Sequence, residues 1–210
     1  MKITKYVHSC LLVEDQGRVG LIDPGMFSLG SGLLETNTLT QLDDIIITHE
    51  HPDHLHLPLL KGLVTKFPHA RIFADPSTAI KLRALGYTNI QTESQPGVDL
   101  FACNHEPTEP LGPAPKNIGV HYLGRLTDPG DSHHFPTCKD ILALPITAPW
   151  GTLTRAAELA SELEPKYVLP IHDWHWNVAA RQQTYDRCET FFNGLGIKFI
   201  KLVDGEAVEL

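Results

Sequence analysis

The chain has 210 residues, enough for one well-buried domain, so we expect a single domain over residues 1–210. Hydrophobic residues make up 42% and charged residues 20%, as in an ordinary soluble globular protein. The formal net charge of −8 argues against a nucleic-acid partner, because nucleic-acid-binding proteins usually present a basic face. No apolar run is long enough for a signal peptide or a membrane span, which favours a cytoplasmic protein without a membrane partner. The four cysteines form no C-x-x-C pair, so we expect reduced thiols.

The start of the chain predicts a small antiparallel sheet. Short apolar runs at residues 2–7, 10–14 and 19–22 are separated by turn residues, and Asp23-Pro24-Gly25 closes the last run. The glycine- and serine-rich residues 27–37 predict an irregular loop, and residues 38–42 predict a short helix before the next strand.

The strongest chemical signal is the run T-H-E-H-P-D-H at residues 48–54, directly after three isoleucines that predict a buried strand. Imidazole and carboxylate groups are ligands that zinc and similar divalent ions accept. The alternative is a polar surface turn that happens to be rich in histidine. The position of the run directly after a buried strand argues against this alternative. A helical H-E-x-x-H site is excluded, because Asp53 stands where its second histidine belongs and Pro52 would interrupt the helix.

The H-x-H-x-D-H pattern of this run resembles the metallo-β-lactamase superfamily, and the chain as a whole resembles its branch of ascorbate-6-phosphate-lactonase-like enzymes. The resemblance implies that His49 and His51 hold one metal ion, and that Asp53 and His54 hold a second. It also implies a four-layer αββα sandwich with the metals in a cleft at one edge of the two sheets. Periodicity alone supports only an α/β layered domain.

The segment after the motif alternates between helix and strand patterns. Pro52 fits a first helical turn, so we expect a helix beginning near residues 55–57 and ending near residue 66. A strand follows at residues 71–74. Asp75 and Pro76 are typical of a helix start, and Gly86 is typical of its end.

Three further ligands follow from the resemblance, each placed after a predicted strand. A strand pattern from residue 98 runs to His105, which matches the third ligand of the first site. Its rival is His121, in the middle of a strand pattern, where packing is the usual role of a histidine. Asp131 matches the aspartate that bridges the metals, with Asp128 as competitor in a D-P-G turn. His172, after the strand at residues 166–171, matches the last ligand of the second site.

The remaining polar groups receive weaker assignments. By the same resemblance Asp23 orients ligands from behind the metal loop, and His8 matches a histidine of the lactonase-like branch, although a structural role is the commoner fate of a lone histidine. His133 and His134 are adjacent in an extended loop, so they should point in opposite directions, and we take neither as a ligand. Trp150 and Trp174 suit either a substrate pocket or aromatic packing. Further elements are expected as strands at residues 140–145, 197–202 and 207–210 and helices at residues 152–163 and 178–192.

The implied function is that of a dinuclear metal-dependent hydrolase. Two divalent ions, Zn²⁺ first and Mn²⁺ or Fe²⁺ as alternatives, would share a bridging hydroxide that attacks an ester, lactone or phosphoester of a small molecule, with Asp53 and Asp131 as catalytic residues. The alternatives are a di-iron oxidoreductase on the same fold and a metal-binding module without turnover. The di-iron flavoproteins resemble H-x-E-x-D-H, whereas this chain has His51 in the middle position, and 210 residues leave no room for a flavin domain. Substrate identity and oligomeric state are not encoded in these motifs.

Overall fold

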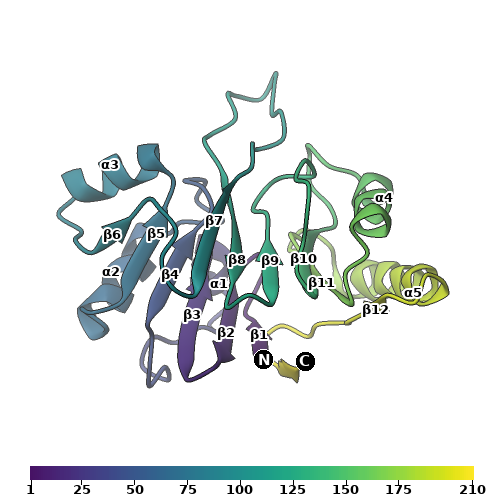
Figure 1. The fold of residues 1–210 in the computed structure, drawn as a ribbon, viewed down its shortest axis with the longest axis horizontal. Helices are drawn as coiled ribbons and strands as arrows, with labels where there is room; N and C mark the ends of the chain where they lie inside the picture. The colour runs from purple at the N-terminus through teal and green to yellow at the C-terminus, as the bar shows by residue number, and fades with distance from the viewer. The chain divides into compact units, whose positions relative to one another are not determined.

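The computed structural model describes all 210 residues, and the chain divides into two compact units (Figure 1). Unit 1 comprises Met1–Ser94 together with Val203–Leu210, and unit 2 comprises Gln95–Leu202. Each unit contains its own β-sheet and helices, which fits the expected α/β class. The expectation of a single domain stays a prediction.

Unit 1 contains a seven-stranded sheet in the order β13-β1-β2-β3-β4-β5-β6. Strands β1 (Lys2–Lys5), β2 (Leu11–Asp15) and β3 (Arg18–Ile22) pair in antiparallel fashion, as the sequence predicts. Strands β4 (Asp44–Ile47), β5 (Arg71–Ala74) and β6 (Ile90–Gln91) continue parallel to β3. The last strand of the chain, β13 (Ala207–Glu209), pairs with β1. The three isoleucines of β4 are fully buried, which confirms the predicted buried strand.

The helices of unit 1 correct three sequence expectations. Helix α1 (Met26–Gly30) occupies part of the expected loop, and its first amide donates a hydrogen bond to the carbonyl of Pro52 (2.8 Å). Residues 38–42 are not helical; the Gln41 side-chain amide donates to the Gly17 carbonyl (3.0 Å), and the adjoining Asp43 exchanges hydrogen bonds with Val19 of β3. Helix α2 (Leu57–Lys66) has Pro58, not Pro52, in its first turn. Helix α3 (Pro76–Ala84) starts as predicted, with the Asp75 carboxylate accepting from the amides of Ser77 and Thr78.

Unit 2 contains a six-stranded sheet in the order β12-β11-β10-β9-β8-β7. Strands β7 (Val98–Ala102), β8 (Ile118–Tyr122) and β9 (Leu126–Asp128) are antiparallel neighbours. Strands β10 (Ile141–Pro145), β11 (Tyr167–Ile171) and β12 (Lys198–Phe199) then run parallel to β9. Strand β7 ends before the expected His105, because the side-chain amide of Asn117 takes the Cys103 carbonyl in place of a ladder partner.

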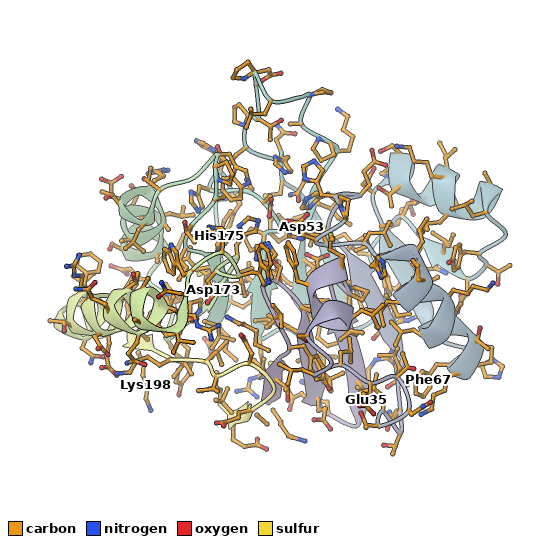
Figure 2. The ribbon with its side chains drawn as sticks, turned by 180° about the vertical axis from the view of Figure 1, so that it is seen from behind. Glu35, Asp53, Phe67, Asp173, His175 and Lys198 are labelled. Atoms are coloured by element: carbon orange, nitrogen blue, oxygen red, sulfur yellow. The ribbon has the colours of Figure 1, made fainter.

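Two helices pack in unit 2. Helix α4 (Leu153–Leu163) lies against β10, with Thr152 capping its N-terminus, and α5 (Val178–Gly194) lies against β12 (Figure 1). Tyr185 of α5 donates a hydrogen bond to the buried Asp173 carboxylate, which fixes the loop after β11. Asp173 and His175 of this loop are labelled in Figure 2. No helix of the chain combines the length and the apolar character needed to cross a bilayer.

Candidate metal centre

The residues of the motif at 48–54 follow β4, the central strand of unit 1. Because β3, β4 and β5 are parallel, the loops after β3 and β4 leave the sheet at the same edge. Such an edge, at the carboxyl ends of parallel strands, is a common location for binding sites in α/β proteins. The edge carries Asp23 after β3 and the histidine loop after β4; Asp53 of this loop is labelled in Figure 2.

Asp23 is the anchor of the histidine loop. Its fully buried carboxylate accepts hydrogen bonds from the Thr48 amide (2.8 Å), the Thr48 hydroxyl (2.7 Å) and Nδ1 of His54 (2.7 Å). The Thr48 hydroxyl has one proton, and it donates that proton in its hydrogen bond to Asp23. The Thr48 oxygen must therefore accept from Nδ1 of His49 (3.1 Å). Both histidines therefore carry their proton on Nδ1, and Nε2 keeps its lone pair, as metal-ligating histidines require.

The glycine of the D-P-G corner allows the histidine loop to approach this corner closely. An added Cβ at Gly25 would lie 1.6 Å from the Asp53 carbonyl oxygen and 2.9 Å from the His54 amide nitrogen. No side chain fits in that space. The corner is thus more than a turn, because it sets the position of the two residues expected to hold a metal ion.

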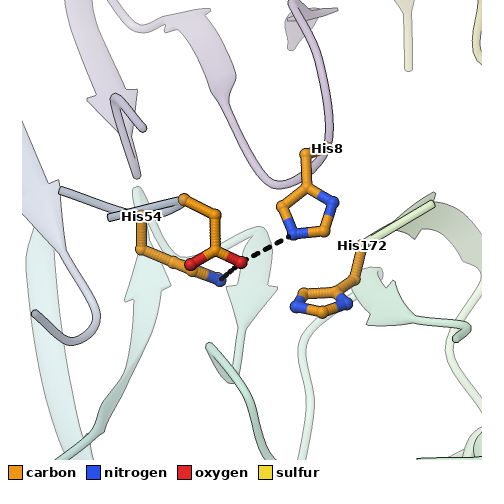
Figure 3. A group of neighbouring side chains, drawn as sticks. His8, His54 and His172 are labelled. Atoms are coloured by element: carbon orange, nitrogen blue, oxygen red, sulfur yellow. Dashed lines mark hydrogen bonds and ion pairs between the residues drawn. The ribbon is translucent and has the colours of Figure 1, made fainter. Parts of the chain in front are cut away.

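The side chains of the histidine loop converge. Nε2 of His49 lies 3.1 Å from Nδ1 of His51, and the rings of His49 and His54 are 4.0 Å apart between centroids. The Asp53 carboxylate lies 3.9 Å from Nε2 of His54 and 3.2 Å from Nε2 of His8, and dashed lines in Figure 3 mark these ion pairs. Unit 1 therefore brings together all four ligands predicted from the motif, with His8 beside them.

Unit 2 brings together the other three predicted ligands. The Asp131 carboxylate lies 3.4 Å from Nε2 of His105 and 3.2 Å from Nε2 of His172. Nδ1 of His105 donates to the Glu106 carbonyl (2.6 Å), and Nδ1 of His172 donates to the Thr147 carbonyl (2.7 Å). A carbonyl oxygen only accepts, so both Nε2 atoms again keep the lone pair.

Three of the seven non-glycine residues with positive φ are residues described above. His8, Asp23 and His172 have φ values of 62°, 46° and 64°, in the left-handed region that residues other than glycine rarely adopt. Such conformations cost about 1–3 kcal/mol each and concentrate at functional sites. Two of these residues are expected to bind or orient a metal ion, and the third contacts Asp53.

The donor sets fit a divalent cation. Two ligands of a tetrahedral zinc ion, each about 2.0–2.1 Å from the metal, are separated by roughly 3.3 Å. The donor pairs His49–His51, His105–Asp131 and His172–Asp131 are separated by 3.1, 3.4 and 3.2 Å. Nitrogen and carboxylate donors at this spacing, with His49, His105 and His172 protonated on Nδ1, are the chemistry such an ion requires.

The rejected candidates have other partners. His121 bonds through Nδ1 to the Thr127 hydroxyl (2.9 Å) and stacks on Phe101, and burial lowers its pKa. Asp128 accepts from the Gly130 amide within its turn (2.9 Å).

The adjacent pair His133 and His134 points in opposite directions, as predicted. His133 is buried, with Nε2 donating to the Pro145 carbonyl (2.8 Å), and burial lowers its pKa. The side chain of His134 is 70% exposed and bonds to the Glu106 carboxylate.

Two contributors were not found from the sequence. Trp150 donates its indole N–H to the Asp131 carboxylate (3.1 Å), a contact across 19 positions that no motif encodes. Glu106 binds the loop that follows Asp131, accepting from the His133 amide (2.7 Å). The only sequence signal for a role of Glu106 at the site was its position directly after the predicted ligand His105.

Comparison with known proteins identifies the family. Residues 2–172 match the family model of the beta-lactamase superfamily domain. Protein Rv0786c of Mycobacterium tuberculosis is 34% identical over 182 residues, which cover 82% of this chain and 84% of that protein. Among solved structures, Igni18, a metallo hydrolase from Ignicoccus hospitalis, superimposes with a TM-score of 0.69 at 21% identity, covering 99% of this chain and 97% of that one. The metallo-beta-lactamase fold protein YhfI from Bacillus subtilis gives 0.65 at 18% identity, covering 99% and 98%.

This chain therefore belongs to the β-lactamase superfamily, and the predicted metallo-β-lactamase fold is confirmed. The lactonase-like branch is not distinguished by these matches and stays a prediction.

Proposed function

We propose that this protein is a dinuclear metal-dependent hydrolase of small molecules. In this proposal His49, His51 and His105 hold one divalent cation, Asp53, His54 and His172 hold the other, and Asp131 is shared by both. Zn²⁺ is the first candidate, and Mn²⁺ or Fe²⁺ would be accepted by the same ligands. The family membership of the chain supports this reading.

One observation carries the proposal: four buried histidines are fixed with the proton on Nδ1. His49 and His54 are fixed through Thr48 and Asp23, and His105 and His172 through backbone carbonyls. A histidine that serves only in packing has no need of this uniform tautomer. Metal-ligating histidines show it regularly, because the second nitrogen is held by a carboxylate or a carbonyl.

The bound cations would supply a water activated at neutral pH and would polarise the substrate oxygen. The residues of the chain have distinct tasks around that chemistry. The Asp53 side chain is 26% exposed, whereas those of His54 and Asp131 are almost fully buried, so Asp53 is the carboxylate best placed to meet solvent and substrate. Asp53 accepts the proton of the attacking water. His8 contacts the same carboxylate and holds it in place. Asp131 orients the histidines of unit 2.

The substrate is proposed to be an ester or lactone, with a phosphoester as the second choice. Three segments are expected to set substrate specificity, residues 27–37, 106–115 and 132–136, and they contain no lysine or arginine. Phosphate groups are commonly bound by arginine or lysine side chains, so their absence from these loops favours an uncharged ester. The four free cysteines agree with the cytoplasmic location that we propose.

The test combines metal analysis with a hydrolase panel. Purified protein is analysed for bound metal and assayed on aryl esters, lactones and phosphodiesters, with and without a chelator. We expect two equivalents of metal and ester or lactone hydrolysis that is lost with the chelator and restored by Zn²⁺. His51→Ala should remove activity and one metal equivalent, whereas His121→Ala should leave both intact.

Other outcomes separate the alternatives. Bound iron with oxygen consumption would indicate a di-iron oxidoreductase, and bound zinc without turnover would indicate a metal-binding module. If His121→Ala loses metal and His105→Ala does not, the assignment of the third ligand is wrong.

A further inference from the structure

We propose that Trp150 is a positioning residue that fixes the Asp131 carboxylate for metal binding; this inference rests on the proposed function. The Asp131 carboxylate is almost fully buried, and one of its oxygens, Oδ2, lies 3.1 Å from the indole nitrogen of Trp150. The same oxygen faces Nε2 of His105 and of His172. The indole N–H is therefore aimed at the oxygen that lies between the two histidine ligands of unit 2.

The backbone of Asp131 is held independently of its side chain. Its amide donates to the Asn117 side chain (3.2 Å), and its carbonyl accepts from the Glu106 amide (2.8 Å). These contacts leave the side-chain torsions to be fixed by other groups. An indole N–H is a donor that does not titrate, so it holds the carboxylate in one orientation at any working pH.

The indole ring also contacts the neighbouring imidazoles. Its centroid lies 5.9 Å from that of His105, 5.4 Å from that of His172 and 5.3 Å from that of His133. Nδ1 of His105 and Nδ1 of His172 are each held by a backbone carbonyl. Contact with the indole further restricts the rotation of these two imidazole rings. One side chain thus touches all three predicted ligands of unit 2.

Trp150 lies in a hydrogen-bonded turn that fixes its backbone. Ala148 and Gly151 exchange backbone hydrogen bonds (3.3 and 3.2 Å) across a tight turn after β10. Gly151 lets the buried His133 ring pack against this turn, since an added Cβ would lie 3.0 Å from that ring. The position of the indole therefore depends on the fold of unit 2 and not on a mobile loop end.

The competing explanation is that Trp150 only fills space. Trp150→Phe separates the two readings, because it keeps an aromatic ring and removes the N–H donor. Trp176→Phe is the matched control, since Trp176 packs against the apolar core of unit 2. Asp131→Ala, alone and combined with Trp150→Phe, completes a double-mutant cycle on the proposed contact.

The readouts are Co²⁺ binding, followed by visible absorption in competition with a chelator, and melting of the metal-free protein. We expect Trp150→Phe to weaken Co²⁺ binding at both sites, which share Asp131, by about 10–100-fold and to change the absorption band, as loss of a group that orients a ligand does in other metal sites. Trp176→Phe should match the wild type. In the Asp131→Ala background, Trp150→Phe should have no further effect.

A second measurement keeps Trp150 intact, in case Trp150→Phe does not fold. In a Trp174→Phe, Trp176→Phe variant the only indole is Trp150, and its emission should change with the same midpoint as Co²⁺ binding. Unchanged affinity and band in Trp150→Phe, or emission indifferent to bound Co²⁺, would overturn the inference while leaving the hydrolase proposal in place. A wild-type protein that binds no metal would instead refute the proposed function.

Discussion

Replacing Gly25 by alanine should disable the metal loop while leaving every predicted ligand in the sequence. The new Cβ would start 1.6 Å from the Asp53 carbonyl oxygen. Ordinary van der Waals contact begins at 3.4 Å, so the two atoms must separate by about 1.8 Å. The backbone of Gly25 has φ −83° and ψ 175°, which any residue adopts, so the effect is purely steric.

The displacement acts on Asp53 and His54, the residues proposed to hold the second cation. A misplacement of about 1 Å at a catalytic centre can lower the rate about 100-fold, so we expect at least that loss of hydrolysis and a weaker second metal site. Overpacking should lower the free energy of unfolding by about 1–3 kcal/mol. Each kcal/mol corresponds to roughly 2–4 °C of melting temperature for a chain of this size.

The assays are metal stoichiometry, turnover and thermal melting on the same preparation. Gly30→Ala is the control, because its Cβ would meet no atom within 4 Å and it lies in the neighbouring helix α1. That variant should bind metal and turn over like the wild type. If Gly25→Ala does so too, the close approach of the corner to the loop does not position the ligands.

Asp23→Asn should weaken metal binding by about 10–100-fold in a chelator competition, because an amide cannot accept hydrogen bonds at both of its terminal atoms. Asp44→Ala should lower the free energy of unfolding in urea by roughly 3 kcal/mol, since the buried carboxylate pairs with Arg18 and Arg71; a loss below 1 kcal/mol would contradict this role. Burial raises the pKa of the Cys188 thiol from its ordinary value of 9.0 to about 11. The neutral thiol of the folded state therefore contributes to the free energy of unfolding in full below pH 9, and this contribution is lost as the pH rises through 11. Cys188→Ala should therefore make stability fall less steeply over that range, and an unchanged slope would refute the assignment.

The histidine loop was predictable because its proposed ligands lie within six positions of one another and follow a strand of three isoleucines. Helix α3 was predictable for a similar reason, since Asp75 and Pro76 form a local start signal. Local chemistry decides such elements, and the sequence displays it directly. Residues 38–42 show the limit of this reasoning, because Gln41 and the adjoining Asp43 bond to Gly17 and Val19, each 24 positions earlier in the chain.

The distant parts of the site were predictable only through the family resemblance. The strand pattern favours His105 over His121, but only the fold shows that His105 faces Asp131 while His121 bonds to Thr127. Trp150 escaped prediction because its partner is far away in the chain. Helix α1 escaped because glycine and serine dominate the segment, while its start depends on a hydrogen bond to Pro52.

The sheet of unit 1 is completed by β13, which follows the whole of unit 2 in the chain. During synthesis on a ribosome, β1 therefore has an open edge until β13 emerges. An unpaired strand edge invites association with other chains. A nascent chain stalled near Leu202 should consequently be more prone to aggregate, or to recruit a chaperone, than a chain that includes β13.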